Sequence, residues 1–205
     1  MSSLIISKDY NYLIGYEDFE GYEQFNVFDL QKNQLLWSSL LDLSKNNRED
    51  VEKLLLITSD SLNIYTRSMG NKGVIMYSLS DGSVIFESKR LHSNYIMQIL
   101  STTAGKRMIT CGKDRKIKVW DQLKQQLISN LLFHEGIVES IVLTRDDKTL
   151  FSGGQDQKIG VWCMKTYTLL THLNCQSKIR TLRISNSGEF LLSESIKDFA
   201  NLRSL

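Results

Sequence analysis

The sequence TCGKDRKIKVW at residues 110–120 returns as SGGQDQKIGVW at residues 152–162, at an offset of 42 residues and without a gap. A histidine stands 18 residues before each copy, at His92 and His134. Self-similarity at a period of about 40 residues is typical of architectures that stack or array one supersecondary unit. The repeat therefore predicts a protein built from like units that presents a surface.

Short apolar runs alternate with turn clusters along the whole chain, and no stretch sustains a helical period over three turns. Grouped in fours, these runs predict all-β, four-stranded antiparallel meanders. Such a sheet has two apolar faces that neighbouring sheets must cover, as they do in a radial array. We expect one domain over residues 1–205, with units at 1–43, 51–90, 91–132, 133–174 and an incomplete 175–205.

The chain resembles the WD-repeat family of β-propellers. IKVWD at residues 117–121 carries the family's signature ending, and IGVWC at 159–163 keeps the Trp but loses the Asp. FNVFD at 25–29 and IMYS at 75–78 are more degenerate. The resemblance spans nearly the whole chain and is strongest over residues 92–173. It implies a β-propeller with about five blades in an incomplete or truncated ring.

The resemblance also implies a buried, hydrogen-bonded quartet in each of the two strong units. These quartets are His92, Thr110, Asp114 and Trp120, and His134, Ser152, Asp156 and Trp162. An Asp in a tight turn can accept from backbone and imidazole N–H groups, while a hydroxyl links the ring to the indole. A His–Asp pair could also suggest catalysis. Because the set recurs from unit to unit, we expect it to be architectural and the protein not to be an enzyme.

The fifth unit departs from this pattern. It has Gln176 where the next histidine should fall and no Trp, although it keeps Ser193 and Asp198. Three interpretations of the unit count remain open. The chain is a fragment of a longer protein, an arc completed by a partner or by self-association, or a closed five-bladed ring.

Composition points to a globular protein, with 41% apolar and 23% charged residues and a net charge of +2. That charge is too small to indicate nucleic acid or a membrane as partner. Cys111, Cys163 and Cys175 show no CxxC spacing and predict buried, reduced thiols, which fit the cytoplasm or the nucleus. The three histidines lack metal-ligand spacing, and no apolar run approaches the roughly 18 residues of a membrane span. We expect no metal, no cofactor and no membrane span.

The resemblance implies a scaffold that docks partner proteins, as part of a multiprotein complex, on one rim of the propeller. The expected rim residues lie near the start of each inner strand and beside the turn Asp. They are Asn94, Tyr95, Lys113, Arg115, Gly136, Glu139, Gln155, Gln157, Lys178 and Arg180. Tyr95 is the expected anchor, since exposed Tyr is favoured at interface hot spots.

An alternative function is binding of nucleic acid, phosphate or phosphoinositide through the basic turn at Lys113–Lys118. Nucleic-acid binding would favour aromatic residues interleaved with the basic ones. Only Trp120, which the quartet already uses, lies among them.

Overall fold

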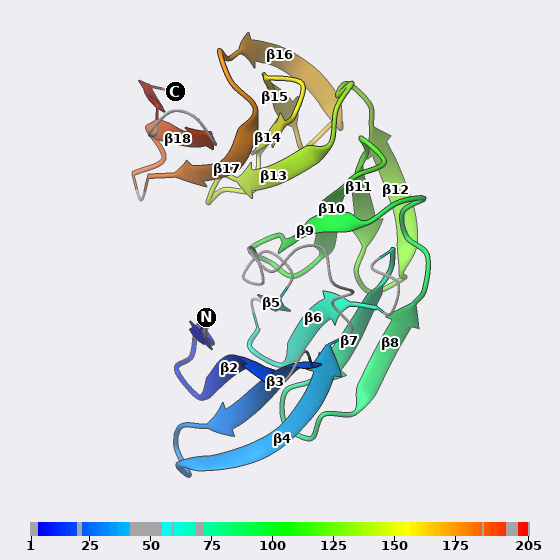
Figure 1. Cartoon of the computed structure of the whole chain (residues 1–205), viewed down its shortest axis with the longest axis vertical. Helices are drawn as coiled ribbons and strands as arrows, with labels where there is room; N and C mark the ends of the chain where they lie inside the picture. The colour runs from blue at the N-terminus through cyan, green and yellow to red at the C-terminus, as the bar shows by residue number, and fades with distance from the viewer. Residues whose placement is uncertain are drawn as a thin grey trace. The chain divides into compact units, whose positions relative to one another are not determined.

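The computed structural model describes residues 4–19, 22–41, 55–58, 60–68, 72–185, 187–195 and 201–204. Within those residues the regular secondary structure consists of β-strands alone. They form four sheets of four antiparallel strands and one sheet of three (Figure 1). This confirms the predicted all-β class with WD-type blades. The chain divides into two compact units, residues 1–96 and 97–205. The expected single domain over 1–205 stays a prediction.

The first unit holds two meander sheets. The first sheet comprises β1 (Leu4–Ile6), β2 (Tyr12–Phe19), β3 (Tyr22–Asp29) and β4 (Gln34–Leu41). The second sheet comprises β5 (Leu56–Ile57), β6 (Asn63–Arg67), β7 (Val74–Ser78) and β8 (Val84–Ser88). Alternate residues of β2 and β3, including Ile14 and Phe25, form a buried cluster with Ile64 and Leu79 of the second sheet region. Period-two alternation thus packs one face of the first sheet on the second.

Three sheets follow. The third comprises β9 (Ile96–Ser101), which starts on the last residue of the first unit, β10 (Arg107–Gly112), β11 (Ile117–Asp121) and β12 (Gln126–Leu131). The fourth comprises β13 (Val138–Leu143), β14 (Thr149–Gly154), β15 (Lys158–Cys163) and β16 (Thr168–Asn174). The fifth comprises β17 (Ile179–Ile184), β18 (Phe190–Ser195) and β19 (Asn201–Ser204).

The fourth sheet is covered on both faces inside the second unit. One face, with Leu150 and Trp162, packs against the third sheet. The other, with Phe151 and Ile159, packs against Ile179 and other residues of the fifth. Gly153 permits the second contact, because a Cβ there would lie 2.5 Å from Cγ2 of Ile179. The repeat therefore buries its apolar faces sheet against sheet.

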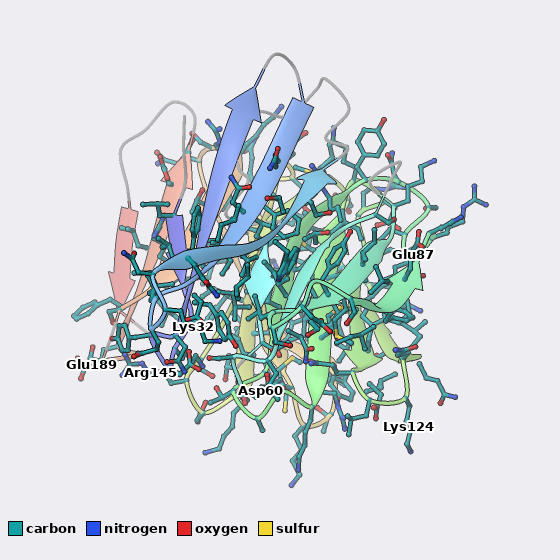
Figure 2. All side chains as sticks on the ribbon, turned by 90° about the horizontal axis from the view of Figure 1, so that it is seen from below. Lys32, Asp60, Glu87, Lys124, Arg145 and Glu189 are labelled. Atoms are coloured by element: carbon teal, nitrogen blue, oxygen red, sulfur yellow. The ribbon has the colours of Figure 1, made fainter. Side chains whose placement is uncertain are left out.

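One turn conformation recurs between the first two strands of every sheet. Each turn begins at a Ser or Thr whose backbone N–H donates to the carbonyl of the residue five positions later. The N–H of that later residue donates back to the side-chain hydroxyl oxygen of the Ser or Thr. The five residues that begin these turns are Ser7, Thr58, Thr102, Thr144 and Ser185. The residue three positions later always has positive φ: Tyr10, Ser61, Gly105, Asp147 and Gly188. Figure 2 labels Asp60, Arg145 and Glu189, which belong to three of these turns. The shared turn extends the repeat to the first, second and fifth sheets, which lack the quartet Trp.

Two further expectations concern compartment. Among the described residues, no helix has the length and apolarity that a membrane crossing needs. The three cysteines, all in the described part of the chain, form no disulfide; Cys111 is buried, whereas Cys163 and Cys175 are half-buried. The prediction of three buried thiols is therefore wrong for two of them, because both lie near the ends of strands.

Candidate functional site

The second quartet forms one continuous chain of hydrogen bonds in the fourth sheet. The indole Nε1 of Trp162 donates to Oγ of Ser152 over 2.9 Å, and that Oγ lies 2.8 Å from Nε2 of His134. Nδ1 of His134 lies 2.9 Å from Oδ2 of Asp156. Because the carboxylate can only accept, Nδ1 carries the imidazole proton, and Nε2 accepts from the Ser152 hydroxyl. All the polar atoms of the imidazole are therefore satisfied by a neutral ring.

Burial controls the charge states in this quartet. The side chains of His134 and Asp156 are only 1% and 5% exposed. Burial lowers the pKa of His134, and the opposing influence of the Asp156 charge does not reverse that shift. Burial acts to raise the pKa of Asp156, but its charge interaction and hydrogen bond with His134 leave that pKa lowered. At neutral pH the pair is a neutral imidazole held by a carboxylate.

Asp156 also fixes the backbone around it. It accepts from the backbone N–H of Glu135 over 3.0 Å, and the Gln155 N–H bonds the Ile137 carbonyl over 2.9 Å. Gly136 allows this close approach, since a Cβ there would lie 2.8 Å from the Asp156 nitrogen. The quartet therefore ties the segment before β13 to the β14–β15 turn. Its ring nitrogens are engaged inside the protein, which is the arrangement of an architectural network.

The first quartet is divided between the two compact units. In the third sheet, Trp120 Nε1 donates to Oγ1 of Thr110 over 3.0 Å, and both residues are buried. Asp114 lies in the β10–β11 turn and accepts from the Lys116 N–H over 3.2 Å. His92 belongs to the first unit, where it is buried and its backbone N–H donates to the Lys72 carbonyl.

The predicted rim residues of the second unit gather on turns and strand starts. Arg115 and Gln157 occupy matching positions of the β10–β11 and β14–β15 turns, with φ of 66° and 64°, and both are exposed. Gln155 donates to Oε1 of Glu139 over 2.6 Å, which orders two neighbouring rim side chains. Lys178 is exposed, whereas Lys113, Gly136 and Arg180 are half-buried.

The other two predicted rim residues lie in the first unit. Asn94 is exposed, and its side-chain oxygen accepts from the Tyr95 N–H over 2.8 Å. Tyr95 is half-buried, and its role as the docking anchor stays a prediction.

The basic turn is only partly available for anions. Lys118 Nζ lies 5.6 Å from the centre of the Trp120 ring, and burial lowers its pKa. Arg115 and Lys116 are exposed beside it. The alternative of phosphate binding at this turn therefore depends on those two residues and stays a prediction.

Sequence reasoning missed a buried polar link between the inner strands. Oε1 of Gln98 accepts from the Ile141 N–H over 2.8 Å and from the Ser140 hydroxyl over 3.1 Å. Oγ of Ser140 in turn accepts from the Leu182 N–H over 3.1 Å. This series joins the third, fourth and fifth sheets. A polar residue inside two apolar strand runs, 42 residues apart, was the available signal.

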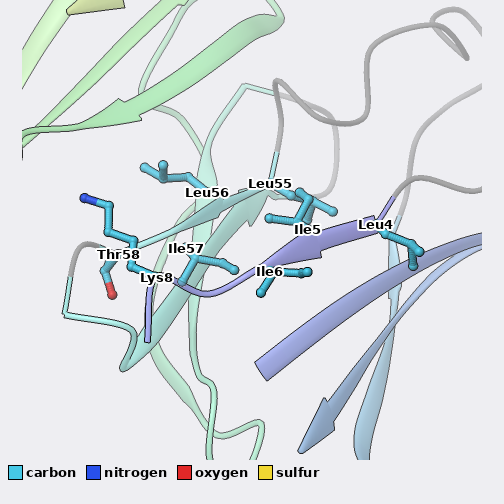
Figure 3. Close-up of a pocket in the computed structure, with 8 residues that line it drawn as sticks. All are labelled: Leu4, Ile5, Ile6, Lys8, Leu55, Leu56, Ile57 and Thr58. Carbon is cyan, nitrogen blue, oxygen red and sulfur yellow. The ribbon is translucent and has the colours of Figure 1, made fainter. Parts of the chain in front are cut away.

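A second missed feature is an apolar groove of about 460 Å³ in the first unit (Figure 3). It is lined by 4–6 and Lys8 from the first sheet and by 55–58 from the second. Its lining is aliphatic apart from Lys8 and Thr58, so it offers no acid–base or metal chemistry. Over the described part of the chain, no group of three or more His, Cys, Asp or Glu side chains could hold a metal ion.

These features define a class: repeated antiparallel sheets, each with a hydroxyl turn between its first two strands, and a buried His–Ser–Asp–Trp network in the fourth sheet. The family model described as WD domain, G-beta repeat matches residues 87–121 and 125–163, which include strands β9 to β15. These two matches support the WD-repeat family that the sequence predicted. No curated protein matches the chain. WD repeats generally act as non-catalytic scaffolds for protein–protein interaction.

Proposed function

We propose that this chain is a non-catalytic scaffold of the cytoplasm or nucleus that docks partner proteins within a multiprotein complex. The observation that carries the proposal is the quartet of the fourth sheet. Its His–Asp pair is buried inside the protein, and Asp156 orders the turn that carries Gln155, which bonds Glu139, and the exposed Gln157. A rigid turn keeps the entropy cost of binding low.

The proposed docking surface, the rim surface, consists of residues from three neighbouring sheets. They are Lys113, Arg115, Gly136, Glu139, Gln155, Gln157, Lys178 and Arg180, all in the second unit. Asn94 and Tyr95 of the first unit are proposed separately as docking residues. In the second unit the rim surface has four cationic side chains and one carboxylate. A partner segment with acidic and hydrogen-bonding side chains would complement this charge.

Capture from an extract of the native cell tests the rim surface. The purified chain is immobilised, and bound proteins are identified by mass spectrometry. We expect the double variant Arg115→Glu/Gln157→Glu to lose the principal bound protein. The matched control, Lys124→Glu/Arg145→Glu, changes exposed residues of other turns and should retain it.

Equal retention by both variants would overturn the rim surface as the docking site. Vesicles containing phosphatidylinositol phosphates test the alternative. Vesicle binding that is lost in Arg115→Glu/Lys116→Glu, with protein capture unchanged, would favour a phosphate-binding module instead.

A further inference from the structure

Tyr10 lies in the hydroxyl turn between β1 and β2, in a backbone conformation that bulky residues rarely adopt. Its φ is 58°, in the left-handed region, and the residue is 72% exposed. The hydroxyl turns that contain Gly105 and Gly188 have a left-handed glycine at the same position, and glycine adopts that conformation without strain. The turn therefore forms without a tyrosine, and its geometry does not explain why this residue is present.

Tyr167 shows how the fold can use a left-handed tyrosine. It lies in the β15–β16 turn with φ of 59° and packs against the buried cluster of the third and fourth sheets. Its hydroxyl also accepts a hydrogen bond from Nε of Arg107 over 3.3 Å. Tyr10 lies outside the buried cluster of the first two sheets, and its hydroxyl bonds none of the described residues. A strained residue that the fold does not use points to a function at that position.

The hydroxyl turns of the first and second sheets lie next to each other. The pKa of Asp9 is lowered most by the hydroxyl of Ser7 in its own turn, and less by that of Ser61 in the second turn. Such an effect requires short range, so Asp9 and Ser61 are neighbours. Leu62, which follows Ser61, is 63% exposed. The exposed side chains of Tyr10 and Leu62 therefore belong to residues that adjoin this contact.

A third exposed apolar side chain extends this surface within the first sheet. Leu30, in the β3–β4 turn, is 40% exposed, and its backbone N–H donates to the carbonyl of Asn11 over 2.8 Å. Asn11 directly follows Tyr10. In an antiparallel meander the first and third turns lie at the same end of the sheet, which explains this proximity.

Carboxylates predominate around these apolar side chains. The first and third turns of the two sheets cover residues 7–11, 29–33, 58–62 and 78–83, and they contain four aspartates and two lysines. Hydrogen bonds from the turn backbone lower the pKa of Asp29 and of Asp81, so both are ionised at neutral pH. Figure 2 labels Lys32 and Asp60, which belong to two of these turns. This end of the first unit therefore has a net negative charge.

We name the residues Asp9, Tyr10, Leu30, Asp60 and Leu62 the acidic turn surface. Tyrosine offers a large, rigid contact area and is enriched at the hot spots of interfaces, while the carboxylates complement cationic groups. We propose that the acidic turn surface is a second docking site, which binds a protein segment that carries Arg or Lys beside an apolar residue. It contains no residue of the rim surface and does not depend on docking there.

Selection of random dodecapeptides, displayed on phage, against the immobilised full chain tests this proposal. We expect the selected peptides to combine Arg or Lys with an aliphatic or aromatic residue. Their affinity, measured by fluorescence anisotropy, should fall as the salt concentration rises. Tyr10→Asn should weaken binding about tenfold or more, because it removes the anchor. Its thermal midpoint should equal or exceed that of wild type, since Asn tolerates the left-handed conformation.

Tyr167→Asn is the matched control. It should lower the thermal midpoint, because that ring packs against the core, but it should leave the peptide affinity unchanged. Leu62→Ser keeps every charge and should weaken the peptides severalfold, which separates apolar contact from charge attraction alone.

Peptides that bind Tyr10→Asn and Leu62→Ser as tightly as wild type would overturn the proposal, and so would a selection that enriches no basic peptides. A lower thermal midpoint in Tyr10→Asn would overturn it as well, because the fold would then need this side chain. Binding that is lost in Arg115→Glu/Gln157→Glu and kept in Tyr10→Asn would support the rim surface and overturn the second site. Loss in Tyr10→Asn with the rim variant unaffected would support the second site by itself.

Discussion

The first and fourth sheets share one strand register but hold their cores by different means. In the fourth, Trp162 and Ser152 belong to a buried polar chain. In the first, Phe28 and Gly15 stand in the corresponding places, so no indole and no hydroxyl can meet there. Its order comes from the opposite face, where Trp37 Nε1 donates to the Leu79 carbonyl over 2.9 Å.

Aromatic contacts add to the Trp37–Leu79 hydrogen bond, which takes the place of the quartet in the first sheet. The ring centres of Phe25 and Trp37 lie 5.4 Å apart, and those of Trp37 and Tyr77 lie 5.7 Å apart. Such pairs add stability beyond the area they bury but impose less directional constraint than a satisfied polar network. The same sheet architecture therefore tolerates loss of the family's quartet when aromatic side chains join adjacent sheets.

The largest expected effect separates the two tryptophans. Trp162→Ala empties a fully buried site and leaves Ser152 with one partner fewer, at a cost of about 3–5 kcal/mol in the free energy of unfolding. Trp37 is half-buried, and Trp37→Ala should cost clearly less. Urea unfolding followed by circular dichroism measures both. Equal losses would show that the quartet of Trp162 and the contacts of Trp37 contribute equally to stability.

The carboxylate of the quartet comes next. Asp156→Asn places an amide where His134 Nδ1–H and the Glu135 N–H both need an acceptor, at a cost of about 2–3 kcal/mol. Asp146→Asn is the control, because Asp146 lies exposed in the β13–β14 turn of the same sheet and should change stability much less. A larger effect at Asp146 would contradict the role assigned to the quartet.

Alanine substitutions at two glycines test the contact that Trp37 makes. Gly82 has φ of 72°, and a Cβ there would lie 2.7 Å from Cδ2 of Trp37. Gly188 has φ of 80° and nothing within 4 Å of such a Cβ. Gly188→Ala should therefore cost only the left-handed backbone penalty of about 1 kcal/mol. Gly82→Ala should cost more, and thermal melts that rank the two in reverse would refute the Trp37 contact.

The smallest expected effect is a pH dependence of stability that comes from His134 in the quartet of the fourth sheet. The folded state holds His134 neutral with a lowered pKa, so below its ordinary value of 6.5 the unfolded chain binds more protons. The stability contributed by His134 is complete above that value and falls as the pH drops toward the folded pKa. Calorimetric midpoints should therefore decline less steeply in His134→Gln than in wild type. Parallel declines would contradict the lowered pKa.

The sequence predicts the third and fourth sheets well because the same residue types occupy the same strand and turn positions at an offset of 42 residues. It predicts the first two less directly, since Phe28 and Tyr77 stand where Trp is expected. Their common signal lies in the hydroxyl turns at Ser7 and Thr58, which were recognised only from their hydrogen bonds.

Site properties that depend on neighbouring sheets could not be predicted in this way. Tyr95 is half-buried because packing around it, and not its residue type, sets its exposure. Leu35 and Leu169 occupy matching positions in the strand register, yet Leu35 is 52% exposed whereas Leu169 packs against the buried cluster of the third and fourth sheets. The repeat pattern specifies an apolar row but not what covers it.

Nitrogen-15 NMR of the imidazole of His134 tests most directly whether the quartet is a sealed structural network. At neutral pH we expect a neutral ring protonated on Nδ1, titration only below the ordinary range, and a Trp162 indole proton that exchanges slowly with water. A ring that titrates at the value of a free histidine, beside an indole proton in rapid exchange, would contradict the account.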